Sequence, residues 1–338
     1  MARADRLRWL DALKGWAILL VVFGHVLSGY LDAGTYPEAY YSFYHVRTWI
    51  YSFHMPLFFL ISGYTFTLAY WREGRLDRPR WGRQLFNLVY IYLLFSILHW
   101  SVKQLFPGSV NETYTLEDLK RIFLVPLGNF WYLYVLVIFY LLGALFRMPA
   151  LHPIWLPVLG GISILAIETH LQWYYLTPYR IVYHLVFFCL GILFQRRPGL
   201  MGHKKLMGAS CMYLAACCFF YYCLGVRNWY SSWRFMIALT TCFFTVFLFS
   251  RSPRLQRGRF LQLCGKNCLE IYLLHTFFTG GLRSILCAIP SPWLSTILNF
   301  LISLFLSIAI ALLSHRLPFM DLVFRPARFF RRLRTGNS

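Results

Sequence analysis

The chain has 338 residues, of which 59% are hydrophobic, 20% are aromatic and only 13% are charged. A soluble protein of this length would carry about 25% charged residues, so the composition excludes an ordinary soluble enzyme. The formal net charge of +21 would suggest nucleic acid in a soluble protein. Here most cations fall in short loops between apolar runs, which indicates an anionic membrane surface and no nucleic-acid partner.

Repeated apolar runs of nearly 20 residues predict an all-α, polytopic transmembrane helical bundle, because barrel strands would need only about ten residues. The whole of 1–338 is expected to form one membrane domain, which ends in a basic tail over 315–338. That tail mixes aromatic residues with arginines, as a segment lying on a membrane surface does. We expect about ten spans, near residues 9–30, 48–70, 84–105, 129–146, 153–169, 179–195, 205–225, 232–250, 264–286 and 294–314.

The distribution of lysine and arginine predicts the orientation of these spans. With both termini inside, the inner segments hold 25 of the 33 Lys and Arg residues and the outer segments hold the other 8. This asymmetry predicts cytoplasmic termini in a multi-pass protein of the plasma (inner) membrane. The first apolar run is interrupted by Lys14 and lacks an A-x-A cleavage site, so we expect a retained helix and not a signal peptide.

The first span carries two ionisable residues, Lys14 and His25, which are eleven residues apart. Eleven residues at about 100° each make three turns, so both side chains share one helix face, about 16 Å apart along the axis. Such ionisable groups are costly to bury inside a membrane, which favours a functional site. In that interpretation Lys14 contacts an anion near the cytoplasmic side, and His25 acts deeper in the membrane as a base or nucleophile. The alternative is structural, with Lys14 extended to the interface beside Asp11 and His25 a satisfied polar group.

The second span contains the segment HMPLFFLISGY at 54–64. Pro56 is expected to kink the helix, and Gly63 to allow a neighbouring helix to approach closely. The predicted topology puts His54 at a depth similar to that of His25, so the two could form a proton relay; alternatively, His54 is a structural polar residue. No carboxylate or cysteine joins them at ligand spacing, so no metal site is expected.

Two later segments add further polar and aromatic groups. Trp131 and Tyr132 begin the fourth span, where aromatic residues alone would indicate anchoring at the membrane interface. Glu270 and His275 lie inside the span near 264–286. A carboxylate in a membrane needs a proton or a cationic partner, which Lys14 or an arginine could supply.

Together these segments resemble the acyltransferase-3 family of membrane acyltransferases over nearly the whole chain. Each of the four motifs alone is weak evidence for the family, but the presence of all four in the family's order is specific to it. The family often has Arg where this chain has Lys14, and more often has Ser where this chain has Cys268. The resemblance rests on the basic-x10-His pair (Lys14, His25), HMPLFFLISGY (54–64), WYL (131–133) and GKNCLEIYLLH (265–275).

The resemblance implies an O-acyltransferase, most simply an O-acetyltransferase. The donor would be cytoplasmic acetyl-CoA or another short acyl-CoA, with no permanently bound cofactor. The acceptor would be a hydroxyl of a surface polysaccharide or of its lipid-linked precursor. A glycan exporter or transporter without acyl-transfer chemistry is the alternative, because polar residues at the midplane and a basic inner face suit both. The sequence has no inverted halves, which counts against a transporter.

Site residues follow from the same resemblance. Cations near the inner face would hold the phosphates of CoA. His25 would be the general base or would first take the acyl group itself, with His54 or His275 assisting. The expected donor-binding residues are Lys14, Arg80 and Arg83, and the expected substrate-binding residues are Trp131, Tyr132, Asn267 and Glu270, with Asn267 also a candidate donor to the thioester oxyanion.

Overall fold

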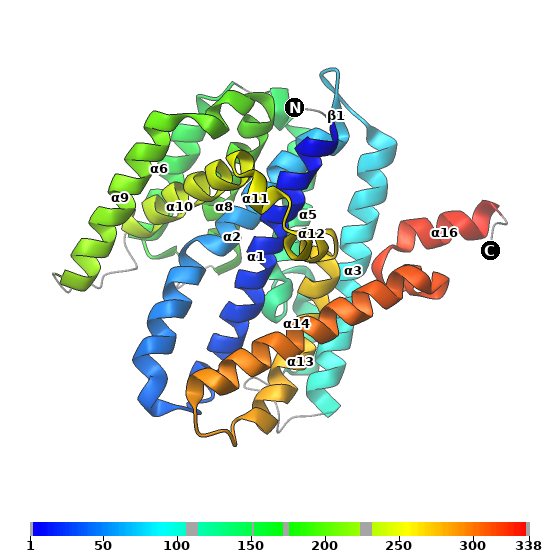
Figure 1. Ribbon diagram of the computed structural model, residues 1–338. Helices are drawn as coiled ribbons and strands as arrows, with labels where there is room; N and C mark the ends of the chain where they lie inside the picture. The colour runs from blue at the N-terminus through cyan, green and yellow to red at the C-terminus, as the bar shows by residue number, and fades with distance from the viewer. Residues whose placement is uncertain (1–2, 106–113, 151, 172–175, 224–231, 336–338) are drawn as a thin grey trace. The chain divides into compact units, whose positions relative to one another are not determined.

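The computed structural model describes residues 3–105, 114–150, 152–171, 176–223 and 232–335. The described chain is almost entirely helical, which confirms the all-α bundle (Figure 1). A short antiparallel hairpin pairs β1 (Trp71–Arg72) with β2 (Arg75–Leu76). The helices are α1 (Arg3–Asp32), α2 (Tyr40–Tyr70), α3 (Arg78–Leu105), α4 (Leu116–Lys120), α5 (Trp131–Leu145), α6 (Trp155–Glu168), α8 (Leu176–Arg196), α9 (Lys204–Cys223), α10 (Ser232–Arg251), α11 (Pro253–Gln256), α12 (Arg259–Lys266), α13 (Cys268–Leu286), α14 (Pro292–Arg316), α15 (Asp321–Phe324) and α16 (Pro326–Thr335).

Each predicted span overlaps helix in the described residues, although residues 224–225 of the span near 205–225 lie outside them. The span near 264–286 is divided between α12 and α13 by Asn267. Among the described residues, six helical segments are long and apolar enough to cross a membrane, by length and composition. The protein is therefore a polytopic membrane protein, and its total number of spans and the side of its termini remain predictions. The six segments are Arg8–Asp32, Arg78–Leu105, Leu116–Leu145, Leu176–Arg196, Trp233–Arg251 and Pro292–Arg316.

The chain divides into two compact units, each built from segments distant in the sequence. The first unit comprises residues 1–17, 51–81 and 135–262, and the second comprises 18–50, 82–134 and 263–338. Helices α1, α2, α3, α5 and α12 contribute residues to both units.

In the first unit, α8 packs on α6, and α10 packs on α9. Helix α8 also crosses α2 at two glycines. A Cβ atom on Gly63 of α2 would overlap the carbonyl oxygen of Phe188, and one on Gly191 of α8 would overlap the carbonyl oxygen of Leu60. The close approach that the sequence predicts at Gly63 is therefore present, and the helix it admits is α8.

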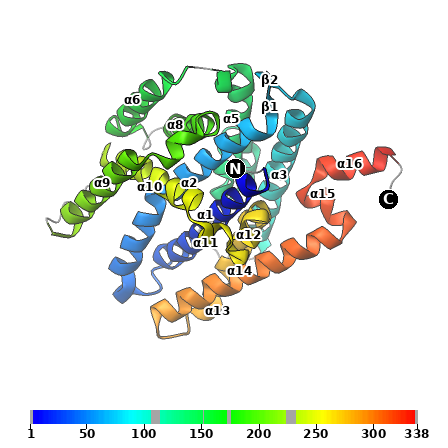
Figure 2. The same ribbon diagram turned by 45° about the horizontal axis from the view of Figure 1, so that its top comes forward.

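In the second unit, α13 and α14 pack along one another and lie side by side in Figures 1 and 2. In a helix of a soluble protein the buried face is apolar and the exposed face is polar, and α14 shows the reverse. Small and polar side chains that recur about every four residues form its buried face. On its other faces α14 exposes large apolar side chains, such as Phe305 at 70%. This arrangement suits lipid outside and close helix packing inside. The buried stripe consists of Ser295, Asn299, Ser303, Ser307 and Ala311.

Candidate active site

The second unit brings His25 of α1 against His275 of α13, with their ring centroids 5.2 Å apart. Helix α1 is continuous from Arg3 to Asp32, so Lys14 and His25 share one face of one helix, as the sequence predicts. His25 is partly exposed, whereas His275 is fully buried. Two residues separated by 250 positions in the sequence (275 − 25) therefore form one imidazole pair.

The hydrogen bonding of His275 determines which of its nitrogens can accept a proton. Its Nδ1 lies 2.9 Å from the carbonyl oxygen of Ile271. A carbonyl oxygen only accepts, so Nδ1 carries the proton and the neutral ring presents a lone pair at Nε2. Nε2 is buried and has no hydrogen-bond partner among the described residues. Buried polar atoms are normally paired, so an unpaired basic nitrogen on a ring that packs against a second imidazole is a candidate for proton transfer.

Contacts near the end of α1 hold this helix against α13 and α14. Arg283 of α13 donates from Nη1 to the carbonyl oxygen of Gly29 at 2.7 Å. The hydroxyls of Tyr30 and Ser295 lie 2.6 Å apart. These contacts constrain the helix ends, and with them the separation of the two imidazole rings.

The WYL segment also meets α13. The hydroxyl of Tyr272 donates to the carbonyl oxygen of Asn129, and its ring lies edge-on to Tyr132 at 5.5 Å. Tyr132 is buried and Trp131 is partly exposed. Because Tyr272 precedes His275 by about one helical turn, two motifs that are far apart in the sequence become neighbours beside His275.

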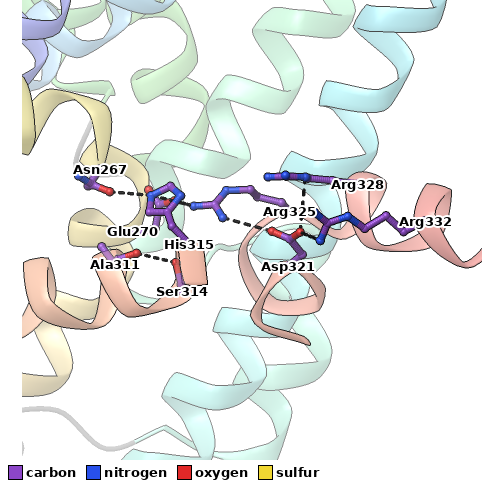
Figure 3. A network of polar contacts seen from close by, with 9 residues as sticks. All are labelled: Asn267, Glu270, Ala311, Ser314, His315, Asp321, Arg325, Arg328 and Arg332. Atoms are coloured by element: carbon purple, nitrogen blue, oxygen red, sulfur yellow. Dashed lines mark hydrogen bonds and ion pairs between the residues drawn. The ribbon is translucent and has the colours of Figure 1, made fainter. Parts of the chain in front are cut away.

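Asn267 and Glu270, at the start of α13, bind groups from the C-terminal part of the chain (Figure 3). Arg325 Nη2 lies 2.7 Å from Glu270 Oε1. His315 Nε2, at the end of α14, lies 2.8 Å from Asn267 Oδ1. The partner of Glu270 is thus an arginine of the tail, one of the two possibilities that the sequence left open.

His99 is a residue that the sequence analysis missed. It lies on α3, and its ring packs against Phe130 at 5.4 Å and against Phe277 of α13 at 5.6 Å. It also interacts electrostatically with His275. Its position beside Trp100 at the end of an apolar run is typical of an interfacial residue, so only the packing of α3 on α13 reveals its proximity to the pair.

The first unit holds Lys14, Arg80 and His54. Lys14 Nζ lies 4.0 Å from Asp11 Oδ1, and its side chain is 28% exposed. Arg80 is exposed and pairs with Asp77 at 3.2 Å.

His54 is buried and stacks on Tyr51 with ring centroids 4.8 Å apart. A second buried histidine of this unit, His184 on α8, was also missed; it contacts Phe59 at 4.7 Å. Arg83 is an exposed residue of α3 and belongs to the second unit. The functional roles of these residues stay predictions.

No group of three or more His, Cys, Asp or Glu side chains that could hold a metal ion occurs in the described part of the chain.

Comparison with known proteins places this arrangement in a family. A family described as "Acyltransferase domain", acyltransferase-3, matches residues 7–316. The nodulation protein NolL of Sinorhizobium fredii is 30% identical over 221 residues, which cover 62% of this chain and 56% of that protein. NolL of Mesorhizobium japonicum is 30% identical over 191 residues, or 56% of this chain and 48% of that protein. The chain thus spans about half the length of these relatives. No solved structure matches the chain.

The family match runs from the start of the helix that carries Lys14 and His25 to the end of α14. It includes His275 and its helix, and it stops before Arg325. The chain therefore belongs to the acyltransferase-3 family.

Proposed function

We propose that the protein is an O-acetyltransferase that moves an acetyl group from cytoplasmic acetyl-CoA to a hydroxyl of a surface polysaccharide or of its lipid-linked precursor. The observation that carries this proposal is the imidazole pair: the rings of His25 and His275 lie 5.2 Å apart between centroids, and the buried Nε2 of His275 has no hydrogen-bond partner among the described residues. Family membership supports acyl transfer in general. That the donor is acetyl-CoA and the acceptor is a glycan is what we propose in addition.

The reaction needs a base because a sugar hydroxyl, with a pKa of about 15, is a poor nucleophile at neutral pH. In direct transfer, His25 takes the hydroxyl proton while the acceptor oxygen attacks the thioester carbon. The carbon–sulfur bond then breaks, and the proton passes to the thiolate of CoA. In the two-step alternative, a ring nitrogen of His25 attacks the thioester carbon, the carbon–sulfur bond breaks, and the proton of the His25 ring passes to the thiolate of CoA. His275 then takes the hydroxyl proton while the acceptor oxygen attacks the acetyl carbon; the carbon–nitrogen bond to His25 breaks, and the proton passes from His275 to the released His25 ring.

The donor is expected to bind through its phosphates and its extended pantetheine arm. Lys14, Arg80 and Arg83 supply positive charge for the phosphates. Lys14 lies on the face of α1 that carries His25 three turns later, so the arm would follow this face and present the thioester to the imidazole.

The acceptor is expected to bind near the aromatic WYL segment. A sugar ring stacked on Trp131 or Tyr132 would lie close to the turn of α13 that carries His275, because Tyr132 packs on Tyr272. Asn267 and Glu270 remain proposed substrate residues of the same helix start. His54 remains a proposed assisting group.

The test uses purified protein in lipid nanodiscs with acetyl-CoA and candidate glycan acceptors. Acceptor-dependent release of free CoA, together with mass spectrometry of surface glycans from cells with and without the gene, should show the transferred acetyl group. If glycan moves across proteoliposomes without consumption of acetyl-CoA, and no acceptor stimulates CoA release, the protein is an exporter and the proposal is wrong.

A further inference from the structure

A charged cluster joins the start of α13 to the C-terminal segment (Figure 3). Arg325 is its centre: Nη2 lies 2.7 Å from Glu270 Oε1, and Nη1 lies 3.2 Å from Asp321 Oδ1. Both carboxylates are buried, with side chains 8% and 5% exposed, and Arg325 itself is 20% exposed. Arg325 Nη2 also lies 3.1 Å from His315 Nε2, which contacts Asn267.

Ion pairs within the C-terminal segment also fix the position of the Arg325 side chain. Asp321 of α15 accepts from Arg332 Nη1 at 2.7 Å and lies 3.5 Å from Arg328 Nε, both on α16. One buried carboxylate thus gathers three arginines. Because Asp321 fixes one edge of the Arg325 guanidinium, the other edge is oriented toward Glu270, as the planar fork of this group allows.

Glu270 depends strongly on this partner. A buried carboxylate without a cation is costly, and removal of one member of a buried pair is strongly destabilising locally. Glu270 stands in the first turn of α13, where a negative charge also suits the helix N-terminus. The ion pair therefore anchors that helix start, and His275 follows within the next turn and a half.

Arg325 lies beyond residue 316, where the family match ends. The family's own motifs, the WYL segment and GKNCLEIYLLH, hold α13 through Tyr272. Arg325 adds a second contact at Glu270, and His315 of α14, which lies next to Arg325, adds another at Asn267. The start of α13 is thus fixed by contacts from two separate parts of the second unit.

We propose that Arg325 is a positioning residue of the acyltransferase: through Glu270 it fixes the start of α13, and so keeps His275 aligned with His25. Arg325 does not contact the reacting atoms in this proposal. The segment 317–335 then supports the geometry of the active site and is not only a basic tail. This inference rests on the proposed acyl transfer.

The test compares single variants in nanodiscs by their kcat, their KM for acetyl-CoA and their thermal unfolding midpoint. We expect Arg325→Ala to lower kcat about 10- to 100-fold, because small misplacements of catalytic groups cost rates of this order. KM should stay within about twofold, since the donor contacts are elsewhere. Arg325→Lys should recover most of the rate. Glu270→Gln should lower kcat similarly, and the double variant Arg325→Ala/Glu270→Gln should be no worse than either single variant, because both remove one interaction.

Arg316→Ala is the matched control, because Arg316 is an exposed arginine at the end of α14 and is expected to keep wild-type kcat. Wild-type kcat in Arg325→Ala, an equal loss in Arg316→Ala, or a kcat loss fully explained by a lower folded fraction would overturn the inference. If Arg325→Ala does not fold, Arg325→Lys and Glu270→Gln decide. A near-normal kcat in Arg325→Lys together with a reduced kcat in Glu270→Gln supports the positioning role. Any other combination of the two results contradicts it.

The two proposals fail differently. If wild-type protein shows no acceptor-dependent CoA release, the proposed function is wrong. If wild-type protein is active and His25→Ala is inactive, but the Arg325 and Glu270 variants are fully active, only the positioning role is wrong.

Discussion

At the scale of single residues, His25 and His275 are the same side chain in different surroundings. His275 is fully buried, and Ile271 fixes the proton on its Nδ1. His25 is partly exposed on the helix face that it shares with Lys14. A substrate can reach a partly exposed ring more readily, so in the proposed reaction His25 would meet the thioester and His275 would accept a proton.

The first prediction concerns His25→Ala. Loss of a general base costs about 10²- to 10⁴-fold in rate, and loss of a nucleophile costs more. We expect acceptor-dependent CoA release to fall at least that far while expression and the unfolding midpoint stay near wild type. More than a tenth of wild-type turnover in a well-folded His25→Ala protein would refute the role.

The second prediction uses His275→Asn, which keeps a donor for the Ile271 carbonyl but removes the basic nitrogen. Turnover should fall about 10²-fold or more with little change in folding. Intact mass spectrometry of this variant with acetyl-CoA and no acceptor separates the two mechanisms, because a stable acetyl adduct on the peptide of His25 requires the two-step path. Wild-type turnover in His275→Asn would leave His275 a packing residue.

The candidate site was only partly predictable at this scale. The spacing of Lys14 and His25 places both on one helix face, because that geometry is local. The contact of His25 with His275 depends on which helices are neighbours, and helical periodicity does not specify neighbours. His99 and Arg325 were missed for the same reason: in the sequence one is typical of an interfacial residue and the other of a surface tail.

At the scale of helices, the packing depends on where backbones can approach closely. Gly63 and Gly191 let α2 and α8 cross with side chains absent from the contact. The sequence predicted the role of Gly63, because it lies in a segment already singled out. Gly191 lies in an apolar run outside any of the motifs. The sequence around it therefore did not indicate which helix it contacts.

The third prediction tests this crossing with Gly191→Leu. Leucine favours helix over glycine by about 1 kcal/mol, but here its side chain must displace the backbone of Leu60, and overpacking costs typically 1–3 kcal/mol. We expect a lower unfolding midpoint in detergent. The control Gly161→Leu, in α6, meets open space and should unfold at or above the wild-type midpoint. Equal midpoints for the two variants would contradict the crossing.

At the scale of the whole molecule, composition and hydropathy were sufficient to predict a polytopic helical protein, because each span is specified by its own length and apolarity. The predicted single domain over 1–338, the count of ten spans and the sidedness rest on loop charges and remain predictions. Two units assembled from interleaved segments could not have been foreseen, since long-range packing leaves no local pattern.

The fourth prediction concerns sidedness. The 25-to-8 partition of Lys and Arg puts the loop with Arg75 inside and the loop with Ala33 outside. Both positions are exposed. In a cysteine-depleted background, Arg75→Cys and Ala33→Cys should react with a membrane-impermeant maleimide from opposite sides. Labelling of both from the same side would refute the topology, and with it the transfer of acetyl groups from a cytoplasmic donor to an external acceptor.

The interleaved construction of the second unit also determines when the imidazole pair can first form during synthesis. His25 leaves the ribosome 250 residues ahead of His275 (275 − 25), an interval of about 12 to 50 s at ordinary rates of synthesis. The two imidazoles cannot meet before α13 is made and inserted. A nascent chain that ends before α13 therefore holds half of the pair, so under the proposed mechanism catalytic activity would arise as one of the last events of biogenesis.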